Sequence, residues 1–583
     1  MAGTHIEREV TVSMFLRVDL SSLSIQTQSV PQVYAQYGGR ALIARLLLDE
    51  MAPGCDPLGP NNLLVIAPGL LAGLPLSSAG RLSVGGKSPL TGGIKEANVG
   101  GNVGDKLGRL GIKAIIVEGL STRDESHLLT IRSEGVELHP AGELRGLGTY
   151  DTVASLQSRF GPDIGVFAVG PAGEMGMRAA GIAVTDDLLG QPGRLAARGG
   201  LGAVMGIKGL KAIVIDDTGA KAPEPHDAEG FKQASRRFAS ELIESPKTGR
   251  QGSMHRYGTA AILSVVQQIG ALPTRNFSRG EFEGAERIGP EQLREVILER
   301  GGKIGERCMG GCVIQCCNVY VDAEGKPIVS TLQFETLALM GSNLEIDDLD
   351  QIACLNRMCN DLGLDTIEMG AALGVAMEAG LASFGDSQAA AQLMQEVAEG
   401  TPIGRILGNG AQIAGQVLGV ARVPVARGQA MPGYDPRALK GNGVTYATSA
   451  MGADHTAGNT IGARQASDPL SPEGKGELSR NLQRIGVMLD MTGLCLFARP
   501  PVVADPGLMV TLLNTRFGWT WNEEDLTRME DEVLRMEREF NRREGFTPVH
   551  DRLPDIFTNE PLPPHNTVFD VPAEELARAV EDL

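Results

Sequence analysis

The chain has 583 residues, of which 42% are hydrophobic, and a formal net charge of −18. This length supports several hydrophobic cores, and the excess of acidic residues, 71 against 53 basic ones, disfavours binding to a nucleic-acid backbone. No uncharged apolar run reaches the roughly 18 residues that a membrane span needs, and the start, MAGTHIEREV, lacks the apolar stretch of a secretory signal. We therefore expect a cytoplasmic protein with no membrane span and no nucleic-acid partner.

The first two hundred residues are predicted to form short strands. The runs FLRVDL, NLLVIAPG, AIIVEG, HLLTIR, GVFAVG and KAIVID are rich in β-branched residues and are bounded by Gly, Asp or Pro. After Asp217 the stretch TGAKAPEPHD, with two prolines, indicates a linker. The pattern predicts a β-rich domain over residues 1–217.

Helical periodicity dominates the rest of the chain, beginning with AEGFKQASRRFASELIES. From about Asp347 to Gly380 the pattern predicts two helices that break at Gly363, with Asp365 and Thr366 at the start of the second. Prolines in VARVPVARGQAMPGYDP indicate another boundary near residue 420. The predicted fold class is α+β, with mainly helical domains over residues 218–420 and 421–583.

Cysteines cluster in the segment ERCMGGCVIQCCNVY, where Cys308, Cys312 and Cys316 are spaced C-x3-C-x3-C. One loop can thus present three thiolates to a metal cluster, and disulfides are not favoured without an export signal. A zinc site would need a fourth ligand, and the nearest His in the sequence is His255. The thiols could instead be small buried hydrophobes, and Cys317 could replace Cys316 as a ligand. The clustering favours a metal cluster.

The cysteine loop and four other segments together resemble the aldehyde ferredoxin oxidoreductase family in order and spacing. These segments are SSAGRLSVGGKSPLTGGIKEANVGG, ARGGLGAVMGIKGLKAI, NDLGLD and DMTGLC. Members of that family hold tungsten, or sometimes molybdenum, between two pterins beside a 4Fe-4S cluster. The resemblance implies a bis-pterin tungsten cofactor (tungstopterin), a 4Fe-4S cluster and a Mg²⁺ ion that bridges the pterin phosphates, all where the β-rich pterin-binding domain meets the helical domains.

The resemblance also assigns residues to the pterins. An arginine offers a bidentate fork to phosphate, and glycines allow close approach of the backbone, although each glycine-rich strip alone is also typical of plain turns between strands. The first strip places Arg81, Asn98, Gly100 and Gly101 near the phosphates, and the second places Ala197, Arg198, Gly199 and Gly200 there. Two copies of the pterin motif D-x-x-G-L-C/D supply Asn360, Leu364 and Asp365, and then Asp490 and Leu494, and Leu496, which follows the second copy, is also assigned to the pterins.

The second copy of the pterin motif ends in Cys495, which the resemblance makes the fourth cluster ligand beside Cys308, Cys312 and Cys316. In the first copy Asn360 stands where Asp is usual, so that a neutral amide replaces a carboxylate acceptor. The first cysteine spacing is also one residue longer than the C-x2-C-x3-C of the best-known members. This difference affects the substrate assignment more than the cofactor assignment.

Two residues match the family's candidates for proton transfer, Glu335 in QFETLALMGSN and His455 in MGADHTAGN. A buried carboxylate beside an anionic metal centre has its pKa raised by desolvation and like charge, which suits it to take a proton from water. His455 could hydrogen-bond the oxygen on which charge develops. A helix cap for Glu335 and a core position for His455 are the alternatives. Asp454 stays unassigned.

The activity that the resemblance implies is oxidation of aldehydes to carboxylic acids. Electrons would leave through the cluster to ferredoxin, or to ferredoxin-like or flavin subunits, in a possible homodimer or hetero-oligomer. A related branch that acts on aromatic acyl thioesters and an electron-transfer subunit with a degenerate active site stay open. A nucleotide-binding oxidoreductase, prompted by VFAVGPAGEMG, has less support because its G-x2-G-x2-G spacing differs from G-x-G-x-x-G.

Overall fold

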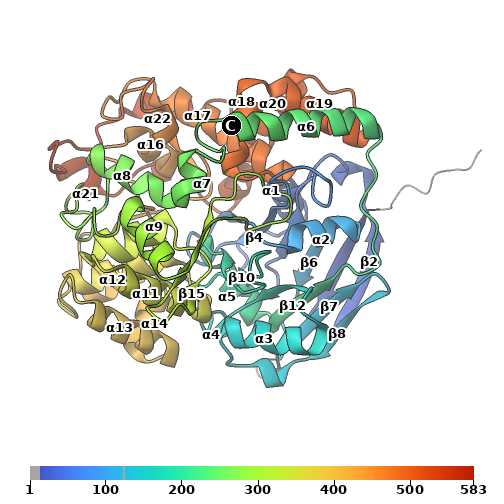
Figure 1. The fold of residues 1–583 in the computed structure, drawn as a ribbon, viewed down its shortest axis with the longest axis horizontal. Helices are drawn as coiled ribbons and strands as arrows, with labels where there is room; N and C mark the ends of the chain where they lie inside the picture. Colours follow the sequence, from blue (N-terminus) through green and yellow to red (C-terminus); the bar gives the residue numbers. More distant parts are fainter. Residues whose placement is uncertain (1–12, 123–124) are drawn as a thin grey trace, which may run out of the picture.

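The computed structural model describes residues 13–122 and 125–583, so the start MAGTHIEREV lies outside the described residues. Two six-stranded sheets built from the first 216 residues are followed by a mainly helical remainder. In Figure 1 the sheets lie at the lower right in blue to teal, and the later helices lie beside and above them in green to orange. This arrangement confirms the α+β class. Within the described ranges no helix is long and apolar enough to cross a membrane.

The first sheet has the strand order β2-β1-β6-β3-β4-β5. β1 and β6 are parallel, and the other neighbours are antiparallel. Its strands are β1 (Met14–Asp19), β2 (Ser24–Ser29), β3 (Leu64–Pro68), β4 (Leu82–Lys87), β5 (Ile94–Val99) and β6 (Ile112–Glu118), with helices α1 (Gly39–Glu50) and α2 (Val103–Arg109) between them.

The second sheet repeats this plan. Its order is β11-β10-β9-β12-β7-β8, with β7 and β12 parallel and the other neighbours antiparallel. Its elements are β7 (His127–Arg132), β8 (Gly135–Pro140), α3 (Thr149–Phe160), β9 (Gly165–Ala168), α4 (Pro171–Glu174), β10 (Ile182–Val184), β11 (Arg194–Ala196), α5 (Leu201–Ile207) and β12 (Leu210–Asp216). The chain therefore contains an internal structural duplication, in which the glycine-rich turns at 98–101 and 197–200 lie at the ends of the equivalent strands β5 and β11.

The two sheets face each other across a shared core. Helices α2 and α5 lie between them, since each contacts strands of both sheets, and apolar residues such as Val18, Leu107, Phe167 and Ile213 fill the space. Helix α1 covers the outer face of the first sheet and α3 that of the second. The edge strands β5 and β11 contact each other. This packing brings the two glycine-rich turns together.

The predicted helix in AEGFKQASRRFASELIES is confirmed as α6 (Ala228–Glu244), which packs against α19 near the chain's C-terminal helices (Figure 1). The predicted division into domains at residues 217 and 420 stays a prediction. The remaining main elements are α7 (Ser253–Tyr257), α8 (Ala261–Gln268), α9 (Pro290–Glu299), α13 (Ser387–Glu399), α14 (Pro402–Gly408), α15 (Ala411–Leu418), α16 (Lys440–Thr448), α17 (Lys475–Thr492), α18 (Pro500–Ala504), α19 (Pro506–Phe517), α20 (Glu523–Arg543), α21 (Asp555–Asn559), α22 (Ala573–Ala579), the small sheet β13 (Lys303–Glu306), β14 (Cys317–Val321) and β15 (Pro327–Val329), and the hairpin β16 (Val425–Ala426) and β17 (Gln429–Ala430).

The two helices predicted around Gly363 are also confirmed. Helix α11 (Leu349–Leu362) ends at Gly363, which has a φ of +70°. Asp365 then caps α12 (Thr366–Glu378), because its Oδ1 accepts a hydrogen bond of 3.0 Å from the Ile367 N–H. The loop NDLGLD is therefore fixed at both ends by helix caps.

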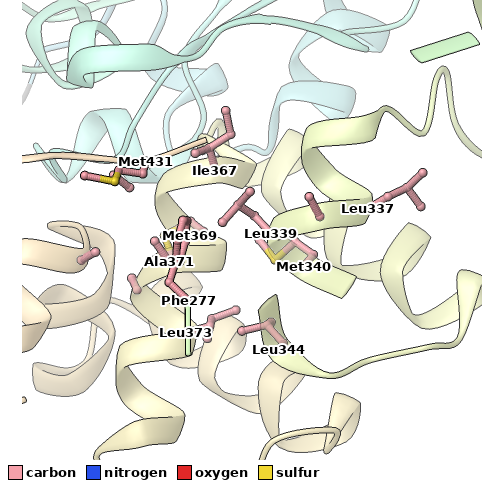
Figure 2. Close-up of a cluster of buried hydrophobic side chains, with 14 of the residues drawn as sticks. Phe277, Leu337, Leu339, Met340, Leu344, Ile367, Met369, Ala371, Leu373 and Met431 are labelled. Carbon is pink, nitrogen blue, oxygen red and sulfur yellow. The ribbon is translucent and has the colours of Figure 1, made fainter. Parts of the chain in front are cut away.

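A buried core anchors the backbone beside Glu335. The short helix α10 (Phe334–Thr336) continues into a π-helical turn, η5 (Leu337–Gly341), a rare geometry that is frequent at functional sites. Figure 2 shows side chains of this turn packed beside those of α12. The labelled residues are Phe277, Leu337, Leu339, Met340, Leu344, Ile367, Met369, Ala371, Leu373 and Met431. This packing holds the segment that carries Glu335.

Candidate active site

Two adjoining cavities lie where the edge strands β5 and β11 meet the helices. The first cavity is lined by residues from 96–100 and 193–198, the cysteine loop, 331–336, 356–367 and 454–456. The second is lined by residues from α7 and α8 and by Tyr434, Asn459 and Arg499. Arg81, Glu335, His455 and Cys495 line both cavities. The two spaces therefore share a wall.

Most of the predicted site residues come together here. Those that line the first cavity are Arg81, Asn98, Gly100, Ala197, Arg198, Cys308, Cys316, Glu335, Asn360, Leu364, Asp365, His455 and Cys495. Leu496 lines the second cavity. The predicted residues that line neither cavity are Gly101, Gly199, Gly200, Cys312, Asp490 and Leu494.

The glycines act on the shape of the turns. A Cβ on Gly100 would lie 3.1 Å from Arg81 Nη1 and 3.5 Å from Cys308 Sγ, so a side chain there would fill the space between the arginine and the cysteine loop. Gly199 adopts a φ of +84°, in the left-handed region that favours glycine, and a Cβ on it would lie 2.3 Å from Lys95 Cγ. Gly199 therefore permits the close approach of β5.

The two pterin-type motifs dock on the two halves of the duplicated β region. The second motif, residues 490–495, is hydrogen-bonded to the first half, and the first motif, residues 360–365, to the second half. The bonds run from Cys495 N–H to Ser78 O (2.9 Å), Arg81 N–H to Gly493 O (3.0 Å), Asp365 N–H to Ala179 O (3.0 Å) and Gly181 N–H to Gly363 O (2.8 Å). The structural repeat therefore extends to the way in which each motif is held.

Side chains of the motifs are engaged within the protein. Asn360 Oδ1 accepts from Asn356 Nδ2 at 3.2 Å, and Asn360 Nδ2 donates to Tyr150 Oη at 3.4 Å. Asp490 Oδ2 lies 3.4 Å from Arg40 Nη1, and burial raises the pKa of Asp490 to about 6. The Asp490 carboxylate thus lies behind the first cavity and not in its wall.

The arginines of the first cavity are oriented by the protein. Arg81 Nη2 donates to the Asn98 carbonyl at 3.2 Å, and its Nε donates to the Asn98 side chain. Arg198 Nη2 donates to the carbonyls of Ala430 (2.6 Å) and Ala453 (2.5 Å), and Nη1 lies 3.4 Å from Asp365 Oδ2. Arg198 Nε is buried without an acceptor among the described residues. It is a donor available to a bound group.

The predicted cluster ligands lie close together. Cys308, Cys316 and Cys495 line the first cavity, and Cys312 Sγ accepts a hydrogen bond of 3.3 Å from the Ser78 hydroxyl. Burial raises the pKa of Cys495. In the described part of the chain, no three His, Cys, Asp or Glu side chains are placed to hold a single metal ion. A 4Fe-4S cluster differs from a single-ion site, because each of its thiolate ligands binds a different iron.

Glu335 and His455 meet in the shared wall. Glu335 Oε2 accepts from the Gly433 N–H at 2.8 Å, and Oε1 lies 3.3 Å from His455 Nε2. Burial raises the pKa of Glu335, an effect that His455 partly offsets. Glu335 Oε1 and His455 Nδ1 have no hydrogen-bond partner among the described residues. The pair is therefore available to a substrate.

Sequence reasoning missed several polar residues of the site. Lys95 pairs with Asp454, and although burial alone would raise the pKa of Asp454, Lys95 and Arg198 hold it well below its usual range. Glu96 also lines the first cavity, and burial and Asp490 raise its pKa to about 8. The available signal was the pair of charged residues Lys95 and Glu96, which lie within a strand whose other residues are typical of a buried strand.

Two sequence profiles match this chain. The profile described as "Aldehyde ferredoxin oxidoreductase, N-terminal domain" matches residues 15–217, and "Aldehyde ferredoxin oxidoreductase, domains 2 & 3" matches residues 233–582. The chain belongs to the aldehyde ferredoxin oxidoreductase family. The family resemblance of the motifs is thereby confirmed, and the protein is an oxidoreductase of this family.

Individual relatives match most of the chain. The tungsten-containing aldehyde ferredoxin oxidoreductases of Thermococcus kodakarensis and Pyrococcus furiosus are each 32% identical over 575 residues, 94% of this chain and 92% of theirs. The aliphatic sulfonate oxidoreductase WOR-like subunit of Pyrococcus furiosus is 28% identical over 471 residues, 73% of this chain and 72% of its own. The active-site complex of benzoyl coenzyme A reductase with 1,5-dienoyl-CoA shares the fold, with a TM-score of 0.79 and 20% identity over 98% of this chain and 93% of that one.

Aldehyde ferredoxin oxidoreductase membership implies a tungsten or molybdenum pterin cofactor, and the first cavity fits such a group. Arg198 Nε offers an unpaired buried donor, and Glu96 Oε1 offers an unpaired buried acceptor. A pterin phosphate carries acceptors and a pterin ring carries N–H donors, so both orphaned atoms would gain partners. Gly100 lines the same cavity beside Arg81 and Cys308, and its lack of a side chain keeps this part of the wall free.

Proposed function

We propose that this protein is a tungsten- or molybdenum-dependent bis-pterin oxidoreductase that oxidises an aldehyde to a carboxylic acid. The observation that carries the proposal is the Glu335–His455 pair, which has unpaired atoms in the wall between two cavities. One of these cavities is lined by residues of the pterin motifs and by cysteines. The tungsten-containing relatives at 32% identity support the same reaction.

We assign the residues that would hold the cofactors from the family pattern and from their places in and around the first cavity. Arg81 and Arg198 would bind the pterin phosphates as charge-assisted donors. Asn98 and Ala197, which hold equivalent positions in the two glycine-rich segments, would provide oxygens to a Mg²⁺ ion. When bound, the metal centre supplies two-electron oxidation. The 4Fe-4S cluster would be held by Cys308, Cys312, Cys316 and Cys495.

The reaction converts one aldehyde and one water into a carboxylic acid, two electrons and two protons. Glu335 accepts a proton from the water that adds to the carbonyl carbon, and its raised pKa makes it a stronger base than an exposed carboxylate. His455 donates a hydrogen bond to the carbonyl oxygen as negative charge develops there. When bound, the cluster would provide a route for the electrons to a ferredoxin, or to ferredoxin-like or flavin subunits.

The proposal is tested with protein purified without oxygen. Because a general base typically contributes about 10²- to 10⁴-fold, Glu335→Gln is expected to lower kcat for aldehydes at least ~100-fold with tungsten and iron contents unchanged. The matched control is Glu283→Gln, since Glu283 is 93% exposed, and it should retain full activity. Absence of tungsten and molybdenum from fully iron-loaded protein would refute the proposal.

A substrate comparison and the Glu335→Gln variant distinguish the related functions. Turnover of an aromatic acyl thioester in place of aldehydes would assign the chain to another branch of the family. Unchanged turnover of Glu335→Gln within a larger complex would indicate an electron-transfer subunit with a degenerate site.

A further inference from the structure

The second cavity concentrates positive charge. It has a volume of about 450 Å³. The described residues that line it include four cations, Arg81, Lys247, Arg464 and Arg499, and one carboxylate, Glu335. The chain as a whole carries a net charge of −18. A locally cationic cleft in an acidic protein attracts anions.

Whereas Lys247 is exposed, Arg499 is a partly buried cation of this cavity that lacks a protein partner among the described residues. Its guanidinium makes no hydrogen bond or ion pair with any residue in the described ranges, whereas Arg81 is held by Asn98, and Arg464 Nη1 donates to the Ile461 carbonyl at 3.1 Å. Burial lowers the pKa of Arg499, because the charge is removed from water without a counter-charge. Arg499 is partly exposed and lines the cavity. A guanidinium with free donors that faces a cavity is placed to bind an anion from outside the chain.

Tyr434 connects Arg499 with the catalytic pair. The Tyr434 ring lies 5.7 Å from the His455 ring. Burial, together with Glu335, raises the pKa of Tyr434 well above its usual range, and Arg499 offsets part of this rise. Both charged groups therefore lie within electrostatic reach of the Tyr434 hydroxyl. Much of the remaining lining is apolar, including Ile262, Val265, Phe334, Ile461, Leu496 and Phe497. The cavity thus combines a reacting end, an apolar wall and an anion-binding group.

We infer that the second cavity takes substrates that carry an anionic group, above all a carboxylate, in addition to the aldehyde, and that Arg499 pairs with that group. The inference rests on the proposed function for the aldehyde. A guanidinium fork matches the two oxygens of a carboxylate, and Lys247 and Arg464 add to the positive potential that draws the anion in. The substrate class is an oxo acid whose aldehyde reacts at Glu335 and His455.

The test compares holoenzyme kinetics on three aldehydes of equal chain length, one neutral, one with a terminal carboxylate and one with a terminal phosphate. We expect kcat/KM to be at least ~10-fold higher for the oxo acid than for the neutral aldehyde. Arg499→Gln should lower kcat/KM for the oxo acid about 10- to 100-fold, the range of a charge-assisted hydrogen bond. The neutral aldehyde should change less than about threefold. Arg499→Lys should recover part of the loss.

The matched control is Arg516→Gln, since Arg516 is another arginine whose pKa burial lowers and it lines neither cavity. It should leave all three substrates unaffected. A phosphate-bearing aldehyde used as well as the oxo acid supports the inference and widens the anion class. Equal use of neutral and anionic aldehydes by the wild type, or an equal loss for both in Arg499→Gln, overturns the inference while leaving aldehyde oxidation standing.

A binding measurement separates the inference from the proposed function. Calorimetric titration of the holoenzyme compares a dicarboxylate product with a monocarboxylate of equal length. Tighter binding of the dicarboxylate that is lost in Arg499→Gln supports the anion site even if no aldehyde is turned over. Equal affinities in both proteins overturn it.

Discussion

Two adjacent cysteines, Cys316 and Cys317, are alternative candidates for the third cluster ligand. Cys316 and Cys317 both line the first cavity, but Cys317 begins β14 and is paired there with Glu306, so its backbone is fixed by the sheet. Cys316 lies in the loop and can adjust to a cluster. We expect Cys316→Ser to lose the cluster and Cys317→Ser to keep about four irons per chain, as measured by iron content and by electron paramagnetic resonance of the reduced protein. Exposed Cys354→Ser is the control. The reverse pattern would make Cys317 the ligand.

Residues of the site differ in how far the sequence could predict them. Cys308 and Cys316 belong to a short motif whose spacing is local, so the order of residues along the chain was enough to predict a metal cluster there, whereas Arg198 was assigned through the family resemblance. Asp454 could not be assigned in this way, because its role depends on Lys95, which is 359 positions away in the chain. Arg499 belongs to no motif, and its interest lies in the missing partner, which only the three-dimensional surroundings reveal.

Among the elements, the strands that the sequence predicted are the apolar ones, such as β3 and β12, whose residues are almost all buried. The missed strands include edge strands, such as β2, SIQTQS, whose residues are mostly exposed, and the three-residue β11. They also include two buried inner strands, β4, LSVGGK, which contains two glycines, and β10, which has three residues. An edge strand needs fewer apolar residues and therefore gives a weaker pattern. The duplication of the sheets was not evident from the sequence, because it is carried by strand pairing and not by residue identity.

Helix α20 carries a buried carboxyl whose titration is a measurable property of the fold. Burial raises the pKa of Glu530 from its ordinary 4.5 to about 8, and Arg484 offsets part of this effect. The folded state therefore binds the proton more tightly, so this contribution to stability is full below pH 4.5 and is lost as the pH rises through 8. Glu530→Gln should be more stable than the wild type at pH 9 by about 1–3 kcal/mol, with the difference shrinking towards pH 5. Thermal midpoints at the two pH values measure it.

A second glutamate on α20 provides the control. Hydrogen bonds from Arg542 and Arg543 lower the pKa of Glu539 to about 2, so Glu539→Gln should bring no gain at pH 9. An equal shift of the thermal midpoint at both pH values in Glu530→Gln would show that the effect is packing and not titration.

At the scale of the whole molecule, the two pterin-type motifs, residues 360–365 and 490–495, pack the helical part against the duplicated sheets. Two glycines make the close contacts. A Cβ on Gly69 would lie 2.1 Å from Gly493 N, and a Cβ on Gly170 would lie 2.2 Å from Leu362 O. Because each contact joins backbone to backbone, no flexible side chain can move aside to make room for a Cβ. The two contacts occupy equivalent places, after β3 and after β9.

We therefore expect Gly69→Ala and Gly170→Ala each to cost about 1–3 kcal/mol of stability, the usual range for overpacking. Each should also lower the amount of pterin and tungsten retained per chain, because each displaces one motif from its half of the β region. Thermal midpoints and metal and pterin analysis of the purified variants measure both effects. Gly142→Ala is the matched control, since no atom lies within 4 Å of its Cβ position and its φ is not left-handed. If the two variants keep full stability and full cofactor, the docked loops do not hold the two parts of the molecule around the site.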